Sequence, residues 1–344
     1  MKSLRILLAF FALATVGGLA YVAQLANTSG TTILAAAQAF SGTLSADQKK
    51  QAIFEFGSDE RFNWNFIPLQ DKNRKSTRKG LPLIDMTAAQ KKAALALLRA
   101  GTSTIGGDAA TTIMSLEAIL RDQESKKKGG NVRDPEWYFF TFFGTPSTTE
   151  KWGWRVEGHH LSLNFTMSGT EVVASTPCFF GANPAQVKSG PDKDKRILPQ
   201  AEDLARDLFK SLDAEQMKTA HQPKHFGESG QKTKNPNLGK PVGIAANKMT
   251  KDQREILKTL VRSYSARMPA DVAEIEMKLV KDGGHDNVHF AFTGSTDAGK
   301  GFTYRVHGPS FVIEFLNIQD DSGGNANNHI HSCWRRVKGD FGVQ

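Results

Sequence analysis

The amino-acid sequence predicts an α+β fold built by internal tandem duplication, with the two halves related by a pseudo-two-fold axis. Three observations favour it. A strand-like segment recurs 150 residues further along the chain, and paired helix starts recur upstream of both copies. Helix-like segments also precede strand-like segments without a regular strand–helix–strand alternation. In each half we therefore expect helices followed by antiparallel or mixed strands.

The recurring strand-like segment keeps its register over twelve residues. Residues 154–165 read WRVEGHHLSLNF and residues 304–315 read YRVHGPSFVIEF. Upstream, Phe142-Phe143-Gly144 matches Phe292-Thr293-Gly294 at the same offset. If each segment is one regular strand, Arg155, Glu157 and His159 share a face with the apolar residues that follow, as Arg305 and His307 do in the second copy. The glycines suggest a bulge, and a one-residue shift would exchange His159 for His160.

Four helix starts are predicted by a capping residue followed three positions later by Gln, the signature of a capping box. They lie at Ser45, Thr87, Asp213 and Thr250. Basic loops containing Pro and Gly, 72–82 and 224–241, separate the two starts of each half. Second helices are expected at 108–124 and 270–281, and the strands are expected to begin near Trp137 and Val288.

The chain is expected to comprise a leader and two halves. Residues 1–26 predict a signal peptide or an N-terminal anchor, because Lys2 and Arg5 precede an apolar run with small residues at Gly18 and Ala20. Residues 35–200 and 201–344 are the predicted halves, which together form one compact unit. We expect an exported protein, periplasmic or extracellular, that contacts a membrane only through an uncleaved leader.

Composition excludes several classes. The 344 residues are 39% apolar and 23% charged, which rules out a disordered or multi-span membrane chain. The net charge of +9 is mild and the basic residues are dispersed, so nucleic acid is not an expected partner. No dinucleotide fingerprint or P-loop occurs, and no nucleotide cofactor is expected. The two cysteines, Cys178 and Cys333, exclude a disulfide scaffold; they form either one disulfide or two separate buried thiols.

Histidines carry the strongest chemical signal. His329-Ile330-His331 would place two imidazoles on one strand face about 6.5–7 Å apart, which suits two ligands of one ion. Imidazole with carboxylate fits one divalent transition metal, Zn, Cu or Fe. Arginines near the strand ends could neutralise a small polar or anionic ligand. The candidate metal ligands are Glu157, His159, His160, His307, His329 and His331, and the candidate ligand-binding residues are Arg155, Arg305 and Arg335.

Three interpretations of these residues stay open. The first is a metal-dependent enzyme, hydrolytic or oxidative, in which His329 and His331 hold the ion with one or two of Glu157, His159 and His307. The second is a non-catalytic binding protein that uses Arg155 and Arg305 on an anionic or polar ligand. The third is an ordinary duplicated fold whose histidines form core hydrogen bonds.

Three motifs resemble a known family. They are EGHHLSLNF at 157–165, FFGANP at 179–184, and HIHS followed by Trp334-Arg335 at 329–335. On these motifs the chain resembles the family named domain of unknown function 3500, over nearly everything after the leader. The resemblance implies secretion and carries over no activity. Members typically continue past Asp-Phe-Gly with a short tail, so a site that needs the tail would be incomplete in this sequence.

Overall fold

A computed structural model describes residues 28–125 and 130–343. The predicted leader, residues 1–26, lies outside the described residues. Among the helices that are described, none combines the length and the apolar character needed to cross a bilayer.

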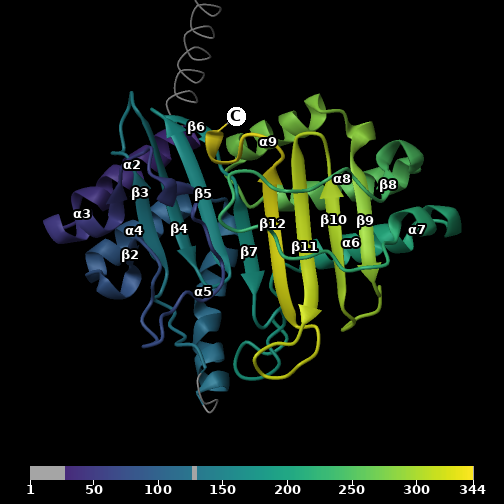
Figure 1. The fold of residues 1–344 in the computed structure, drawn as a ribbon, viewed down its shortest axis with the longest axis horizontal. Coiled ribbons are helices and arrows are strands. Elements are labelled where there is room, and N and C mark those ends of the chain that lie inside the picture. Colours follow the sequence, from purple (N-terminus) through teal and green to yellow (C-terminus); the bar gives the residue numbers. More distant parts are fainter. Residues whose placement is uncertain (1–27, 126–129, 344) are drawn as a thin grey trace, which may run out of the picture.

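The described residues form one mixed sheet of twelve strands (Figure 1). The strand order is β1-β3-β4-β5-β7-β12-β11-β10-β9-β8, with β2 paired to β3 and β6 paired to β5. All pairs are antiparallel except β1 with β3. The strands are β1 Ile53–Phe54, β2 Leu81–Pro82, β3 Phe139–Phe143, β4 Lys151–Gly158, β5 Leu161–Ser168, β6 Glu171–Ala174, β7 Cys178–Ala182, β8 Ile244–Ala245, β9 His289–Gly294, β10 Phe302–His307, β11 Phe311–Gln319 and β12 His329–Arg336.

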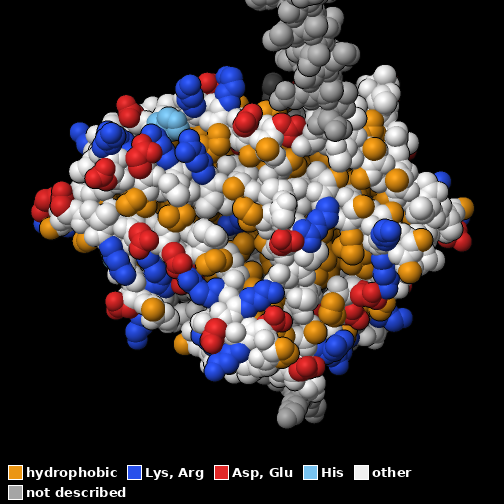
Figure 2. Space-filling view, turned by 180° about the vertical axis from the view of Figure 1, so that it is seen from behind, with side chains coloured by type: hydrophobic (Ala, Val, Ile, Leu, Met, Phe, Trp, Pro, Cys, Tyr) orange, Lys and Arg blue, Asp and Glu red, His pale blue; other side chains and the backbone are white. Residues whose placement is uncertain are grey.

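Helices cover one face of the sheet and loops cover the other. Figure 1 shows the helices behind the strands, and Figure 2 shows the helix-covered side, where charged groups of both signs are interspersed around apolar ones. On the opposite face, loops 55–80 and 222–243 meet where Lys232 N donates to Trp64 O at 3.3 Å. The helices are α2 Ser29–Gly42, α3 Ala46–Ala52, α4 Ala88–Ala100, α5 Thr104–Glu124, α6 Pro199–Lys210, α7 Ala214–Ala220, α8 Lys251–Ser265 and α9 Ala270–Asp282.

The four predicted capping boxes are confirmed. Ser45, Thr87, Asp213 and Thr250 each accept a hydrogen bond from the backbone of the Gln three residues later, whose side chain bonds back to the cap. These paired bonds satisfy two amides that the first turn of a helix leaves without partners. The predicted α+β class is also confirmed, with a mixed sheet.

The expectation of one continuous strand through Arg155 and Leu161 is wrong. Strand β4 ends at Gly158 and β5 begins at Leu161, so His159 and His160 form the turn of an antiparallel hairpin. Glu157 lies opposite Ser162 in the hairpin, so the polar side chains of β4 are on the loop-covered face of the sheet. Leu161, one residue before Ser162, points to the helix-covered face. The second copy behaves alike, because β10 and β11 form a hairpin.

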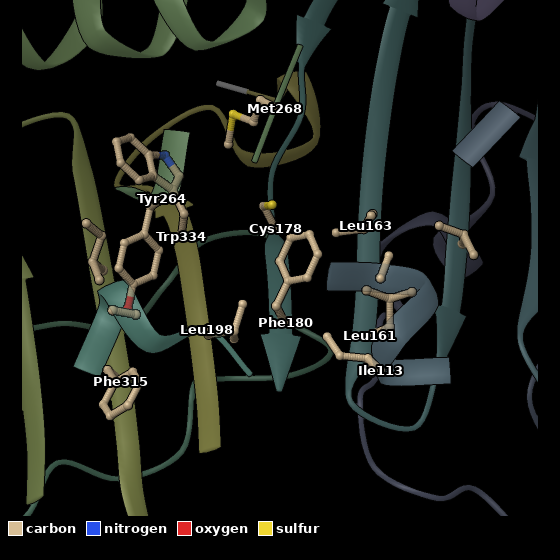
Figure 3. Packing of buried hydrophobic residues seen from close by; sticks show 14 of the residues in the cluster. Ile113, Leu161, Leu163, Cys178, Phe180, Leu198, Tyr264, Met268, Phe315 and Trp334 are labelled. Carbon is tan, nitrogen blue, oxygen red and sulfur yellow. The ribbon is translucent and has the colours of Figure 1, made fainter. Parts of the chain in front are cut away.

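The main apolar core lies between the sheet and the helices. Figure 3 shows its centre, where Ile113 of α5 and Phe180 of β7 face Tyr264 of α8 and Trp334 of β12. A smaller cluster lies under the loops, made of Trp64, Phe66, Phe179, Cys333 and Phe341. The centre of the sheet is therefore packed against the main apolar core on the helix side and against a smaller, mostly aromatic cluster on the loop side.

Of the two alternatives for the cysteines, separate buried thiols are correct. Cys178 and Cys333 are both free and buried. They lie on neighbouring strands, but Cys178 is opposite Trp334 and Cys333 is opposite Phe179. Side chains one residue apart in register point to opposite faces of a sheet, so the two sulfur atoms are kept apart by the backbone. Burial raises the pKa of Cys178 to about 12, which leaves it a protonated, unreactive thiol.

Candidate metal centre

Three histidines from distant parts of the chain converge at the centre of the sheet. His160 Nε2 lies 2.8 Å from His329 Nε2 and 3.3 Å from His331 Nε2. One ligand atom from each residue lies within 4.8 Å of the others. Ligands of a tetrahedral ion with bonds of about 2.05 Å are about 3.3 Å apart, so this spacing is close to what such an ion needs. The three histidines could hold a metal ion.

The β4–β5 turn places His160 in this cluster. His160 has a positive φ of 62°, a left-handed conformation that non-glycine residues rarely adopt. Its backbone is fixed on both sides, since His160 N donates to Phe66 O at 2.8 Å and Gly181 N donates to His160 O at 2.7 Å. A Cβ atom on Gly181 would lie 3.1 Å from Cδ2 of His160. The missing side chain at Gly181 is what allows the imidazole to approach the neighbouring strand.

Strand β12 supplies the other two imidazoles from one face, as expected, but their rings lie closer together than the predicted 6.5–7 Å. His329 and His331 lie on the loop-covered face, with ring centroids 4.8 Å apart. His331 Nδ1 lies 2.6 Å from Oε2 of Glu228, which comes from loop 222–243. An ionised carboxylate only accepts hydrogen bonds, so Nδ1 is the donor in this contact, and in the neutral ring the lone pair of Nε2 then points into the cluster. This is the tautomer that a metal ligand requires.

His159 supports the cluster from one side. Its ring stacks on His160 with centroids 3.7 Å apart. His159 Nδ1 bonds to the carboxylate of Glu117 in α5, and Arg133 contacts the same imidazole. Because both partners hold His159 away from the other nitrogens, it orients His160 and is not itself among the three convergent groups.

Burial favours the neutral form of two of the convergent imidazoles, those of His160 and His329. Burial, followed by repulsion between a protonated ring and the neighbouring histidines, lowers the pKa of His160 well below its usual range. The same causes lower the pKa of His329 to about 3. A neutral imidazole is the form that binds metal, so these two side chains need not lose a proton at neutral pH.

Other predicted site residues lie under the loops and bind each other. Glu157 is 1% exposed and pairs with Arg78 and with Arg155, whose Nη2 also lies 2.7 Å from Glu60 Oε1. Their partners come from loop 55–80, which they attach to the sheet. Glu157 is therefore a buried ion-pair partner and is outside the cluster of imidazoles.

The remaining predicted arginines are likewise paired within the chain. Arg305 Nη2 lies 2.7 Å from Glu314 Oε1, and Arg335 Nε lies 2.7 Å from Asp340 Oδ2. Arg335 is fully buried and also donates to the Gly230 and Thr233 carbonyls. With Arg155 bound to Glu60, the structure does not bring the three arginines together around a common space.

His307 lies outside the cluster. It lies on β10, two strands away from β12. The β10 residue level with His331 is Thr303, four residues before His307. At ordinary sheet spacings this places the Cα atoms of His307 and His331 roughly 16 Å apart. Its Nδ1 is buried and has no hydrogen-bond partner within residues 28–125 and 130–343. Burial, with contributions from Arg305 and His289, lowers the pKa of His307 to about 4.

This lowered pKa predicts a loss of stability in acid. Between pH 6.5 and pH 4 the unfolded chain takes up a proton at residue 307 that the folded chain does not, so stability falls as pH falls, by at most about 1.4 kcal/mol per pH unit. In His307→Gln this part of the slope should be absent. Urea unfolding at pH 7, 5.5 and 4.5, in the presence of a chelator, measures it. An unchanged slope in His307→Gln would contradict the assignment.

Glu228 was missed by the sequence analysis, because a lone Glu in a basic loop carries no recognisable signal. Its Oε1 also accepts from Gln319 Nε2 at 2.9 Å, and its side chain is 39% exposed. Glu117 and Arg133 were missed for the same reason. Their contact with the histidines exists only in the folded chain.

We predict that Glu228→Ala weakens metal affinity by about 10–100-fold, because the proton on His331 Nδ1 loses its acceptor and the ring its orientation. Competition with a chromogenic chelator measures the affinity. Glu228→Gln keeps an acceptor oxygen and should lose less. Glu215→Gln, an exposed residue paired with Lys218, is the control. Equal affinities for Glu228→Ala and the control would exclude this role.

These features define an α+β protein with a buried cluster of three imidazoles at the centre of a mixed sheet. The family described as protein of unknown function (DUF3500) matches residues 26–343. The chain therefore belongs to this family, as its motifs indicated. No curated protein matches the chain, and no solved structure does.

Proposed function

We propose that the protein is an exported, metal-dependent enzyme, hydrolytic or oxidative, in which His160, His329 and His331 hold one divalent transition metal. The observation that carries the proposal is the convergence of three Nε2 atoms, two of them 2.8 Å and 3.3 Å from the third. Without an ion, each short Nε2–Nε2 contact needs one ring to donate an N–H to the other. A cation in the place of that proton could accept the lone pairs of all three rings.

The donor set favours zinc, copper or non-haem iron. All three ligand atoms are imidazole nitrogens, which suit these metals, whereas calcium and magnesium prefer oxygen. Catalytic zinc sites commonly have three protein ligands and an open position, where the ion can acidify water or polarise a carbonyl. His329 is only half-buried, so we infer that the open position faces solvent beside this residue and Glu228.

The alternative, a binding protein for an anion held by Arg155 and Arg305, has less support. Each of these guanidinium groups already has a carboxylate partner in the folded chain. An anion entering there would have to displace a buried ion pair, which is costly. The proposal therefore rests on the histidines and leaves Arg155, Arg305 and Arg335 as structural residues.

We also infer that the fold arose by duplication, with 35–200 and 201–344 related by a pseudo-two-fold axis between β7 and β12. Outward from this seam the order is β7, β5, β4, β3 on one side and β12, β11, β10, β9 on the other. Equivalent capping glutamines make equivalent bonds: Gln90 Nε2 donates to Thr43 O and Gln253 Nε2 to Ser211 O. His160 corresponds to Ser310 in the second copy, so the site would have evolved in one copy only.

Export rests on the sequence of residues 1–26, and an exported metalloprotein would acquire its ion outside the cytoplasm or during export. N-terminal sequencing of protein purified from the exported fraction tests this part. A mature chain that begins near residue 27 supports it, and an intact leader on cytoplasmic protein contradicts it.

Metal analysis tests the central proposal. Untagged protein, purified without chelator, should contain about one Zn, Cu or Fe per chain. The loaded and chelator-stripped forms are then compared on panels of ester, phosphoester and oxidisable phenol substrates. Activity that depends on the ion supports an enzyme, and an ion without activity on any panel reduces the proposal to a metal-binding protein. Sub-stoichiometric metal after incubation with each ion would refute it.

A further inference from the structure

A second candidate site lies on the helix-covered side, away from the histidines. A cavity of about 170 Å³ opens between α5, the start of α6 and the connection from α8 to α9. Among the residues that line it, Arg267, Ser263, Thr112 and Gln200 offer polar groups, and Ala109 and Leu198 form part of its apolar wall. The volume suits a small ligand, because drug-sized molecules need about 300 Å³ or more.

Arg267 is the feature that points to a ligand. It is 5% exposed, and among the described residues no carboxylate lies within ion-pair distance of its guanidinium group. Nη1 donates to Ser332 Oγ at 3.0 Å, and the group lies over the ring of Tyr264, 4.4 Å from its centroid. A neutral hydroxyl and an aromatic face do not balance a buried positive charge. The Arg267 charge therefore lacks a counter-ion.

The other buried arginines show the contrast. Arg78, Arg133, Arg155, Arg206 and Arg335 each pair with a carboxylate. Arg61 has no carboxylate partner among the described residues, but its Nη1 donates to the Phe341 carbonyl at 2.7 Å, and Arg61 does not line this cavity. Arg267 thus combines a missing counter-ion with a cavity that could admit one.

Two further features favour a negative charge in the cavity. Helix α6 begins there without a side-chain cap, since its N-cap residue Leu198 is left-handed with φ 57° and is followed by Pro199. Uncapped amides at a helix start favour anions. The one carboxylate in the lining, Asp108, is already bound to Arg99 Nη1 at 2.5 Å. Lys195, at the rim, adds positive charge.

The backbone holds Arg267 in place. Arg267 N donates to Tyr264 O at 3.2 Å, and Arg267 O accepts from Ser103 N at 3.1 Å, so α8 and α5 both fix its position. We propose that this cavity binds a small oxyanion, a carboxylate, phosphate or sulfate, through the guanidinium group of Arg267. The site is independent of the proposed metal centre.

Thermal unfolding and calorimetry with sodium phosphate, sodium sulfate and sodium acetate test the proposal, with ionic strength held constant by sodium chloride. At least one oxyanion should bind saturably and raise the melting temperature of the wild-type protein. The comparison of acetate with the two tetrahedral ions assigns the class. In Arg267→Gln the dissociation constant should rise at least tenfold. Arg262→Gln removes an exposed arginine of α8 and should bind as wild type does.

A second variant keeps the test decisive if Arg267→Gln does not fold. Ala109→Leu adds volume to the cavity wall and leaves the guanidinium group in place, and it should also lose binding. The proposal is overturned if no oxyanion binds saturably, if the ions stabilise wild type and Arg267→Gln equally, or if Ala109→Leu binds as tightly as wild type.

Discussion

Protein carrying both His329→Ala and His331→Ala is expected to retain less than a tenth of the metal bound by the wild type. The two changes remove two of the three Nε2 atoms that converge at the centre of the sheet. One imidazole on a rigid turn does not hold a transition metal against buffer, because affinity depends on the number of ligands. Metal content after dialysis against metal-free buffer measures the loss.

The same variant should lose its response to added metal. An ion that binds only the folded state at a thousand times its dissociation constant stabilises that state by about 4 kcal/mol. We expect this gain in wild type and none in the double variant. The matched control is His285→Ala with His289→Ala, two partly exposed histidines of the second half that lie outside the cluster. Equal metal content in the two double variants would exclude the assigned ligands.

Glu157→Gln is expected to lower the free energy of unfolding by about 3–5 kcal/mol. Glu157 pairs with Arg78 and Arg155 and accepts from Asn65 N at 2.7 Å, all within a buried region. An amide cannot balance the charge of Arg78, which otherwise donates to the backbone carbonyls of Asn65 and Ile67. Urea unfolding measures the change.

Metal content separates this structural role from the ligand role that the sequence predicted for Glu157. Below its unfolding temperature, Glu157→Gln should bind as much metal as wild type. Glu171→Gln, on the exposed part of β6, should change stability by less than about 0.5 kcal/mol. A Glu157→Gln protein that is as stable as this control but lacks the ion would show that Glu157 is a ligand after all.

Much of the architecture could be predicted from the sequence, because helix caps and strand alternation are patterns of neighbouring residues. A capping residue and its Gln are three positions apart, so the pattern at Thr87 and at Thr250 marks a helix start whatever surrounds it. The pairing of His329 with His331 follows equally from strand alternation. Fold class, helix starts and two of the three convergent histidines could therefore be predicted.

Only the tertiary structure decided which histidines meet at the centre of the sheet and on which face each cysteine lies. The turn between β4 and β5 reversed the chain after Gly158, which took His159 out of the cluster and brought His160 into it. The register of β7 against β12 places the two cysteines on opposite faces of the sheet. The sequence alone could not decide whether they form a disulfide or remain free. Both outcomes depend on a shift of one residue, which exchanges the two faces of a strand.

The sequence by itself determined the α+β class, the helix starts, the family motifs and the placement of His329 and His331 on one strand face. The tertiary structure alone decided that His160 completes the cluster, that Glu228 orients His331, and that Glu157 and the three predicted arginines pair within the chain. The physical reason is the distance along the chain between the residues that interact. Helix caps and strand alternation act over a few residues, whereas a site at the centre of this sheet joins residues as far apart as His160 and His331, whose meeting depends on the strand order.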